Sequence, residues 1–159
     1  MELVLNLSVF LGLLALGYFF GQQAEKKHYL SINAREKEYR ALPVMNLKNP
    51  ELLEREVEAA VLVTGNMVVA VDYFKVFVAA LQNVFGGRVT QYEPLVDRAR
   101  REATLRMQEE ALRHGADLIM NVRLDTSFLG DMHKRNAGVS SIESIAYGTA
   151  IRYKPTTIS

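Results

Sequence analysis

The chain has 159 residues, with 19 basic and 18 acidic side chains and a formal net charge of +1. This balance argues against a non-specific binder of nucleic acid or another polyanion, because such proteins concentrate positive charge. The absence of cysteine excludes disulfides, cysteine-based zinc sites and thiol nucleophiles. The length fits one domain and one further segment.

Residues 3–20 form an apolar run that is interrupted by Asn6, Ser8 and two glycines. As a helix with a rise of about 1.5 Å per residue, this run is just long enough to cross the roughly 30 Å hydrocarbon core of a bilayer. The aromatic residues from Tyr18 to Phe20 are of the kind found at a membrane interface. We therefore expect residues 1–21 to be a transmembrane anchor.

Two other interpretations of this run are less favoured. A cleavable signal peptide normally has a basic start and a cleavage site of small residues, and the segment has neither feature. A buried core helix is the third interpretation, but a hydrophobic helix at an extreme terminus has little to be buried against.

The orientation of the anchor follows from the charges beside it. Glu2 precedes the apolar run, and basic residues follow it, namely Lys26, Lys27, Arg35, Lys37 and Arg40. The positive-inside rule then predicts a single pass through a bacterial-type inner membrane, with the C-terminal part in the cytoplasm. We expect residues 22–50 to be a charged juxtamembrane linker and residues 51–159 to be the folded domain.

The first half of this domain carries a strand pattern followed by a helix pattern. Residues 58–64 and 67–71 read as two strands of a hairpin, and Gly65-Asn66 between them is a turn signal. After Asp72, apolar residues recur at helical spacing up to Phe85, which predicts an amphipathic helix.

A long charged helix should run from about Tyr92 to His114, where Gly115 supplies a C-terminal stop. One apolar stripe along it consists of Leu95, Ala99, Ala103, Met107 and Ala111. On the other faces, Glu102 precedes Arg106 by four residues and Glu109 precedes Arg113 by four, a spacing that favours ion pairs. The interleaved carboxylates indicate a solvated face and not a nucleic-acid patch.

The last part of the chain reads as two further strands. These are residues 118–124 and 141–153, with a polar loop over residues 125–138 between them. The predicted order is β-β-α-α-β-β. It indicates an α+β fold with a small antiparallel sheet packed on two helices, preceded by a single transmembrane helix.

Four segments of the domain resemble one known family. They are VLVTGNMV at 61–68, NVFGGRVTQYEPLVDRARREA at 83–103, HGADLIMNVRLDTS at 114–127 and IAYGTAI at 145–151. In order and spacing they are similar to the YbjQ-like family, which is labelled heavy-metal-binding. The resemblance implies a dodecin-like subunit that assembles with itself as a closed ring, typically a pentamer, with no established activity. Residues 1–50 lie outside it, and Arg98 departs from its pattern, which has an acid there.

No motif of a nucleophile elbow, phosphate-binding loop, dinucleotide fingerprint or metalloprotease helix is present, so we expect no enzyme. Gly86-Gly87-Arg88 could cradle a phosphate, but a helix stop followed by a turn is the simpler interpretation. The candidate ligand-binding residues are the polar ones inside the family-like segments, Asn66, Arg88, Tyr92, Asp125 and Tyr147.

Metal ligands are sparse in this sequence. The three histidines, His28, His114 and His133, lie far apart, and soft metals prefer clustered Cys or His. Asp131 and His133 are the weak candidates for a metal site shared between subunits. We therefore expect no cofactor.

These features lead to two functional hypotheses. The first is a membrane-anchored, self-assembling ring that acts as a scaffold or interaction platform, with the bilayer and further copies of itself as partners and no nucleic acid. The alternative is a module that binds a metal or a small anion at subunit interfaces near Arg88 and Tyr147.

Overall fold

The computed structural model describes residues 1–46, 55–70, 93–130 and 139–155, and forms two compact units, Met1–Ala34 and Arg35–Ser159. The expected helix after Asp72, the Gly86–Arg88 segment and the start of the charged helix at Tyr92 lie outside the described residues. So do Asp131 and His133.

Helix α1 extends from Glu2 to Glu38, and the 3-10 turn η1 follows at Tyr39–Ala41. The helix continues beyond the apolar run because residues 22–41 contain neither glycine nor proline. By length and composition it could cross a membrane, and the apolar side chains of its first half are exposed. The charged segment up to Glu38 is therefore helical.

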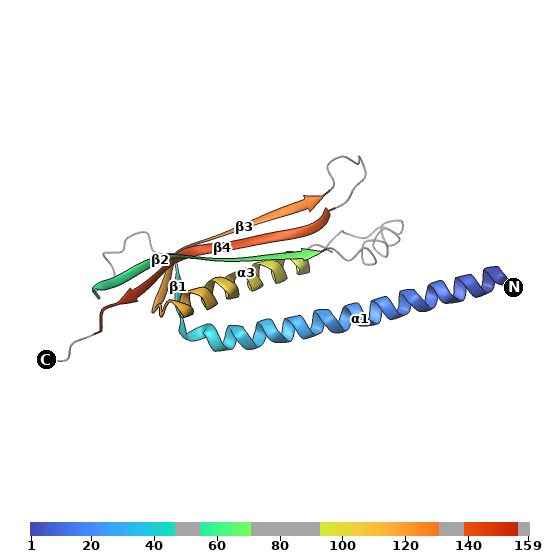
Figure 1. The fold of residues 1–159 in the computed structure, drawn as a ribbon, viewed down its shortest axis with the longest axis horizontal. Helices are drawn as coiled ribbons and strands as arrows, with labels where there is room; N and C mark the ends of the chain where they lie inside the picture. Colours follow the sequence, from blue (N-terminus) through green and yellow to red (C-terminus); the bar gives the residue numbers. More distant parts are fainter. Residues whose placement is uncertain (47–54, 71–92, 131–138, 156–159) are drawn as a thin grey trace. The chain divides into compact units, whose positions relative to one another are not determined.

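The sheet has four strands, β1 (Val44–Met45), β2 (Val57–Ala70), β3 (Leu118–Gly130) and β4 (Val139–Tyr153). Their order across the sheet is β1-β3-β4-β2, with β1 parallel to β3 and the other pairs antiparallel. Helix α3 (Glu93–Arg113) packs on one face, as Figure 1 shows. The α+β class is confirmed, and the sheet is mixed because of β1, a strand too short to leave a pattern in the sequence.

The predicted hairpin over residues 58–71 is wrong, because β2 is one continuous strand of 14 residues. Gly65 lies in its middle and pairs with Ala146 of β4. A Cβ at Gly65 would lie 2.1 Å from the carbonyl oxygen of Ala103 and 2.4 Å from the amide nitrogen of Met107. The glycine is therefore present for the close approach of α3, not for a turn.

The predicted loop from residue 125 is also wrong over its first part, because β3 continues to Gly130 and pairs with β4. Its polar residues Asp125 and Ser127 are exposed on the sheet face opposite α3. In a strand every second residue points to the same face, so polar residues at these positions are compatible with a strand as well as with a loop.

Helix α3 confirms the central expectation. It ends at Arg113, and Gly115 adopts a φ of +66°, as a C-terminal glycine stop requires. All residues of the predicted apolar stripe are buried, including Ala99 and Ala111. Of the two expected ion pairs along the helix, Glu102–Arg106 is present, whereas Glu109 and Arg113 do not pair with each other.

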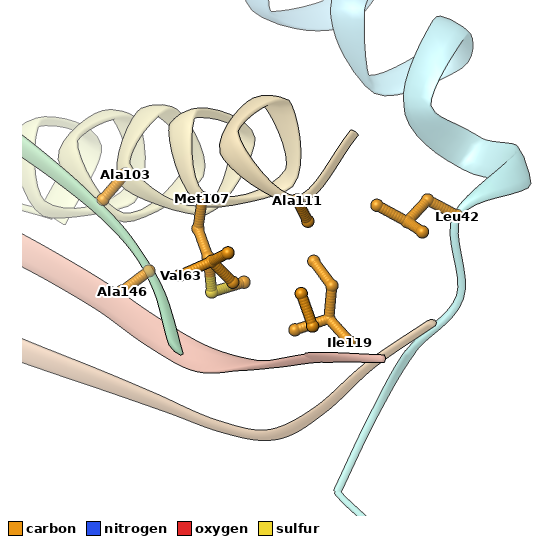
Figure 2. Close-up of a cluster of buried hydrophobic side chains, with 8 residues drawn as sticks. Leu42, Val63, Ala103, Met107, Ala111, Ile119 and Ala146 are labelled. Atoms are coloured by element: carbon orange, nitrogen blue, oxygen red, sulfur yellow. The ribbon is translucent and has the colours of Figure 1, made fainter. Parts of the chain in front are cut away.

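The main core lies between α3 and the sheet (Figure 2). Its members are mostly small or aliphatic, namely Leu42, Val63, Ala103, Met107, Ala111, Ile119, Ala146 and Ala150. Alanines on both the helix and β4 leave no bulk between the layers, so the helix axis can approach the sheet closely. Met107 fills the remaining space with a flexible side chain.

Arg98 is half-buried on α3, and its Nε is buried without a hydrogen-bond partner in the part of the chain that the structure describes. This is the position at which the resemblance leads us to expect an acid. A buried donor without a partner costs free energy, so this Nε does not stabilise the fold.

A bulge in β3 gives a first testable prediction. The pairing with β4 shifts between Met120 and Arg123, and Asn121 inside the shift has a φ of +55°. Asparagine tolerates this left-handed conformation, whereas a β-branched residue does not. We expect Asn121→Gly to leave the free energy of unfolding within about 0.5 kcal/mol, and Asn121→Val to lower it by about 1–2 kcal/mol.

Denaturant unfolding of the full-length protein in detergent measures both changes. Equal stability of the two variants would show that the left-handed conformation is not needed. Beside the bulge, Gly148 of β4 lies against Ile119 and Val122, where a Cβ would come within 3.0 and 3.1 Å of their methyl carbons.

Candidate functional site

Three of the five predicted ligand-binding residues share one face of the sheet. Asn66 of β2 and Asp125 of β3 are both in register with Ile145 of β4, and Tyr147 lies two residues further along β4. Residues in register on neighbouring strands point to the same face. Ala146, which lies between Ile145 and Tyr147 on β4, points toward α3 and is buried. Its two neighbours, and the residues in register with them, therefore lie on the face opposite α3.

The spacing on this face suits a ligand that bridges strands. Asn66 and Asp125 flank the central strand β4, so they lie roughly 9–10 Å apart at two strand spacings. Tyr147 is in register with Thr64 and Arg123, which adds a cation to the same face. Arg88 and Tyr92 lie outside the described residues, so the predicted set of five stays a prediction.

A concave feature that we did not predict from the sequence lies between β2 and α3. It is a polar cleft of about 370 Å³, lined by Thr64, Gly65, Asn66, Arg106, Glu109, Glu110 and Arg113. On the helix side of this cleft, two glutamates lie between two arginines. Its one trace in the sequence is Gly65, whose pairing with Asn66 reads as a turn.

Two side chains of the cleft hydrogen-bond to the backbone of β2. The amide N–H of Thr64 donates to Oε2 of Glu110 at 2.6 Å, and Nη1 of Arg106 donates to the carbonyl oxygen of Asn66 at 2.8 Å. Glu109 and Arg113 line the same cleft without making either kind of contact to β2. Side chains of α3 therefore form hydrogen bonds with backbone groups of β2 that do not pair with β4.

The strongest electrostatic feature joins the last turn of α1 to α3 within the unit Arg35–Ser159. The guanidinium of Arg35 donates to both carboxylate oxygens of Glu102, at 3.2 and 2.5 Å, and Arg101 donates twice to Glu36, both at 2.7 Å. Arg106 also donates to Glu102, at 3.1 Å. The arginine comes from α1 in one forked pair and from α3 in the other, and together the pairs fix the last turn of α1 on α3.

Glu102 is almost fully buried, with 3% of its surface exposed. Burial by itself would raise the pKa of this carboxyl, but hydrogen bonds from Arg35 and Arg106 outweigh it and hold the pKa below its usual value. The hydrogen bonds from Arg101 likewise lower the pKa of Glu36. In their charged form, both carboxylates therefore stabilise the folded state relative to the unfolded state.

These elements define a small α+β domain, in which a helix and a four-stranded sheet enclose an alanine-rich core. A family model described as "Putative heavy-metal-binding" matches residues 44–154, well over half of the chain. The chain belongs to this family, the YbjQ-like family.

Curated relatives agree with this assignment. A "UPF0145 protein" of Archaeoglobus fulgidus is 40% identical over 102 residues, which cover 64% of this chain and 87% of the relative. Another, from Halorubrum lacusprofundi, is 38% identical over 112 residues, covering 69% of this chain and 100% of the relative. A solved structure of a protein of unknown function from Pediococcus pentosaceus aligns with a TM-score of 0.41 at 15% identity, over 71% of this chain and 98% of that one.

The family description raises the question whether this chain can hold a metal. Within the described ranges, no group of three or more His, Cys, Asp or Glu residues is placed to hold a metal ion. His114 is exposed at the end of α3, and Asp131 and His133 lie outside those ranges. The described side chains therefore do not fit a metal centre.

Proposed function

We propose that this protein is a membrane-anchored scaffold that assembles with itself as a ring on the cytoplasmic side of the membrane. Residues 3–20 are its anchor. The observation that carries the proposal is helix α1, whose apolar run exposes large side chains such as Phe10, Leu13 and Phe19 at 58%, 64% and 61%. Exposed apolar side chains on a helix of this length are stabilised by lipid.

Self-assembly is supported by the resemblance to the family and by the sheet face opposite α3. On that face Leu62, Val68 and Ile145 are exposed at 66%, 51% and 39%. Large apolar side chains grouped on one face favour contact with a protein surface. Several anchors on one assembly would also strengthen attachment, because binding of one subunit raises the effective concentration of the others at the bilayer.

The anchor is tested with two charged variants of the full-length chain. We expect the wild-type protein to stay in the membrane fraction after an alkaline wash. Leu11→Arg combined with Leu13→Arg should release it, because each arginine near the middle of a transmembrane helix costs about 2.5–3.5 kcal/mol. Leu30→Arg, a change of the same kind outside the run, should not. A wild-type protein found in the soluble fraction contradicts the anchor.

The mass of the wild-type protein in detergent tests the ring. A single species at a multiple of the 17.9 kDa chain supports it, and a monomer contradicts it. Metal analysis of the same sample tests the alternative function, a module that binds a metal or a small anion. That alternative is favoured by the common face of Asn66, Asp125 and Tyr147, and stoichiometric metal in the sample would make it the first choice.

A further inference from the structure

The outer edge of β2 is unusual for a sheet edge. Strand β2 pairs with β4 on one side, and no other described strand pairs with it. From Ala59 to Ala70 it contains neither a charged residue nor a proline. Such a long, uncharged edge with several valines is a template for pairing with another strand, and natural edges normally carry a lysine, a proline or a bulge that prevents this.

Helix α3 provides the charges that the strand lacks. Successive residues of a strand direct their N–H and C=O groups to opposite sides, so Thr64 and Asn66 both direct theirs away from β4. These are the groups that an added strand would use. Two of these four groups are bound instead by side chains of α3, since Glu110 accepts from the N–H of Thr64 and Arg106 donates to the carbonyl of Asn66.

Gly65 makes this arrangement possible. It lies between Thr64 and Asn66 and faces α3, where a Cβ would meet the backbone of Ala103 and the Cβ of Arg106 at 2.1 and 2.9 Å. Because the helix passes so close to the strand at this point, its side chains one turn apart reach over the strand to the outer edge.

We propose that Arg106 and Glu110 close the middle of the β2 edge to the addition of a strand from a second copy of this chain. A second copy is the occupant that fits, because the uncharged, valine-rich strand is complementary to itself. The inference goes beyond the scaffold function, since it assigns a surface through which copies do not join. Assembly then uses other surfaces and stops at a defined size.

The test compares two double variants of the full-length protein in detergent. Arg106→Ala with Glu110→Ala removes both contacts to β2. Glu109→Ala with Arg113→Ala is the matched control, since it removes one cation and one anion, four residues apart, from the same cleft. We expect the first variant to form larger species that bind thioflavin T, and the control to keep the wild-type mass.

A second measurement follows the edge directly. Hydrogen exchange of the Thr64 amide should become at least tenfold faster in monodisperse Glu110→Ala, because the amide loses its acceptor, and Glu110→Gln should restore most of the protection. Glu110→Ala leaves the Glu102–Arg106 pair intact. The exchange rate of its Thr64 amide can therefore be measured even where the double variant fails to fold.

The proposal is overturned when the Arg106/Glu110 variant is folded and keeps the wild-type mass, or when the Thr64 amide exchanges as slowly in Glu110→Ala as in wild type. It is also overturned when the control variant grows to the same larger species, since loss of surface charge alone then explains the effect. A wild-type monomer would contradict the proposed ring but not the proposal for the β2 edge. The edge proposal is tested by whether the Arg106/Glu110 variant grows larger than wild type and the control variant does not.

Discussion

Gly65→Ala is expected to destabilise the domain by about 3 kcal/mol or more. A Cβ at this position would overlap two backbone atoms of α3, the carbonyl oxygen of Ala103 at 2.1 Å and the amide nitrogen of Met107 at 2.4 Å. Backbone atoms of a helix cannot turn aside as a side chain can. The helix must therefore move away from β2, which opens the core around Met107 and Val63.

Denaturant unfolding of the full-length protein in detergent measures this change against two other glycines. Gly148→Ala should cost less, because its neighbours, the methyls of Ile119 and Val122 and the carbonyl oxygen of Met120, are at 3.0, 3.1 and 3.2 Å and need to shift by only a few tenths of an ångström. Gly17→Ala, where a Cβ meets nothing within 4 Å, should not lower the stability. A Gly65→Ala protein as stable as wild type would contradict the close crossing of α3 over β2.

Glu102→Gln is expected to lower the free energy of unfolding by about 2–3 kcal/mol near pH 7. The substitution keeps the size of the side chain but removes the charge that two arginines, Arg35 and Arg106, bind at a nearly buried position. Glu109→Gln is the control on the same helix, because Glu109 is exposed and forms no ion pair with Arg113. We expect its effect to stay within about 0.5 kcal/mol.

The pH dependence provides a second test of this cluster. The pKa values of Glu102 and Glu36 are lower in the folded protein than the ordinary value of 4.5. As the pH falls below about 4.5, the unfolded chain takes up protons first. The stability that these carboxylates contribute is therefore complete above that pH and is lost as the pH falls through the lower, folded-state values.

Unfolding curves of wild type and Glu102→Gln between pH 3 and 7 measure this dependence. The wild-type stability should fall more steeply at the acid end, and the two proteins should converge there. A constant difference between them across the range would show that the charge of Glu102 is not what stabilises the cluster.

Patterns confined to one element were predicted well from the sequence. Helix α3 and its C-terminal glycine followed from a stripe four residues apart and from Gly115. Strand β4 followed from a long alternating run. In these segments the local preference and the tertiary structure agree, so the local pattern alone determined the result.

Interpretations that depended on a neighbouring element were less successful. Two of the three described candidate residues, Asn66 and Asp125, come from segments whose sequence predicts a turn and a loop, and both are in strands. Glu102 was expected to be solvated, yet it is buried, because Arg35 is bound to it from 67 residues away in the chain. A partner at that separation leaves no periodic signal in the sequence.

The sequence by itself thus determined the family, the α+β class and the apolar N-terminal run, since each depends on residue types in order along the chain. The tertiary structure decided the meaning of Gly65, the burial of Glu102 and the coverage of the β2 edge by Arg106 and Glu110. The physical reason is the same in each case. A glycine or a charged side chain is compatible with several local conformations, and the atoms that another element places within a few ångströms select one of them.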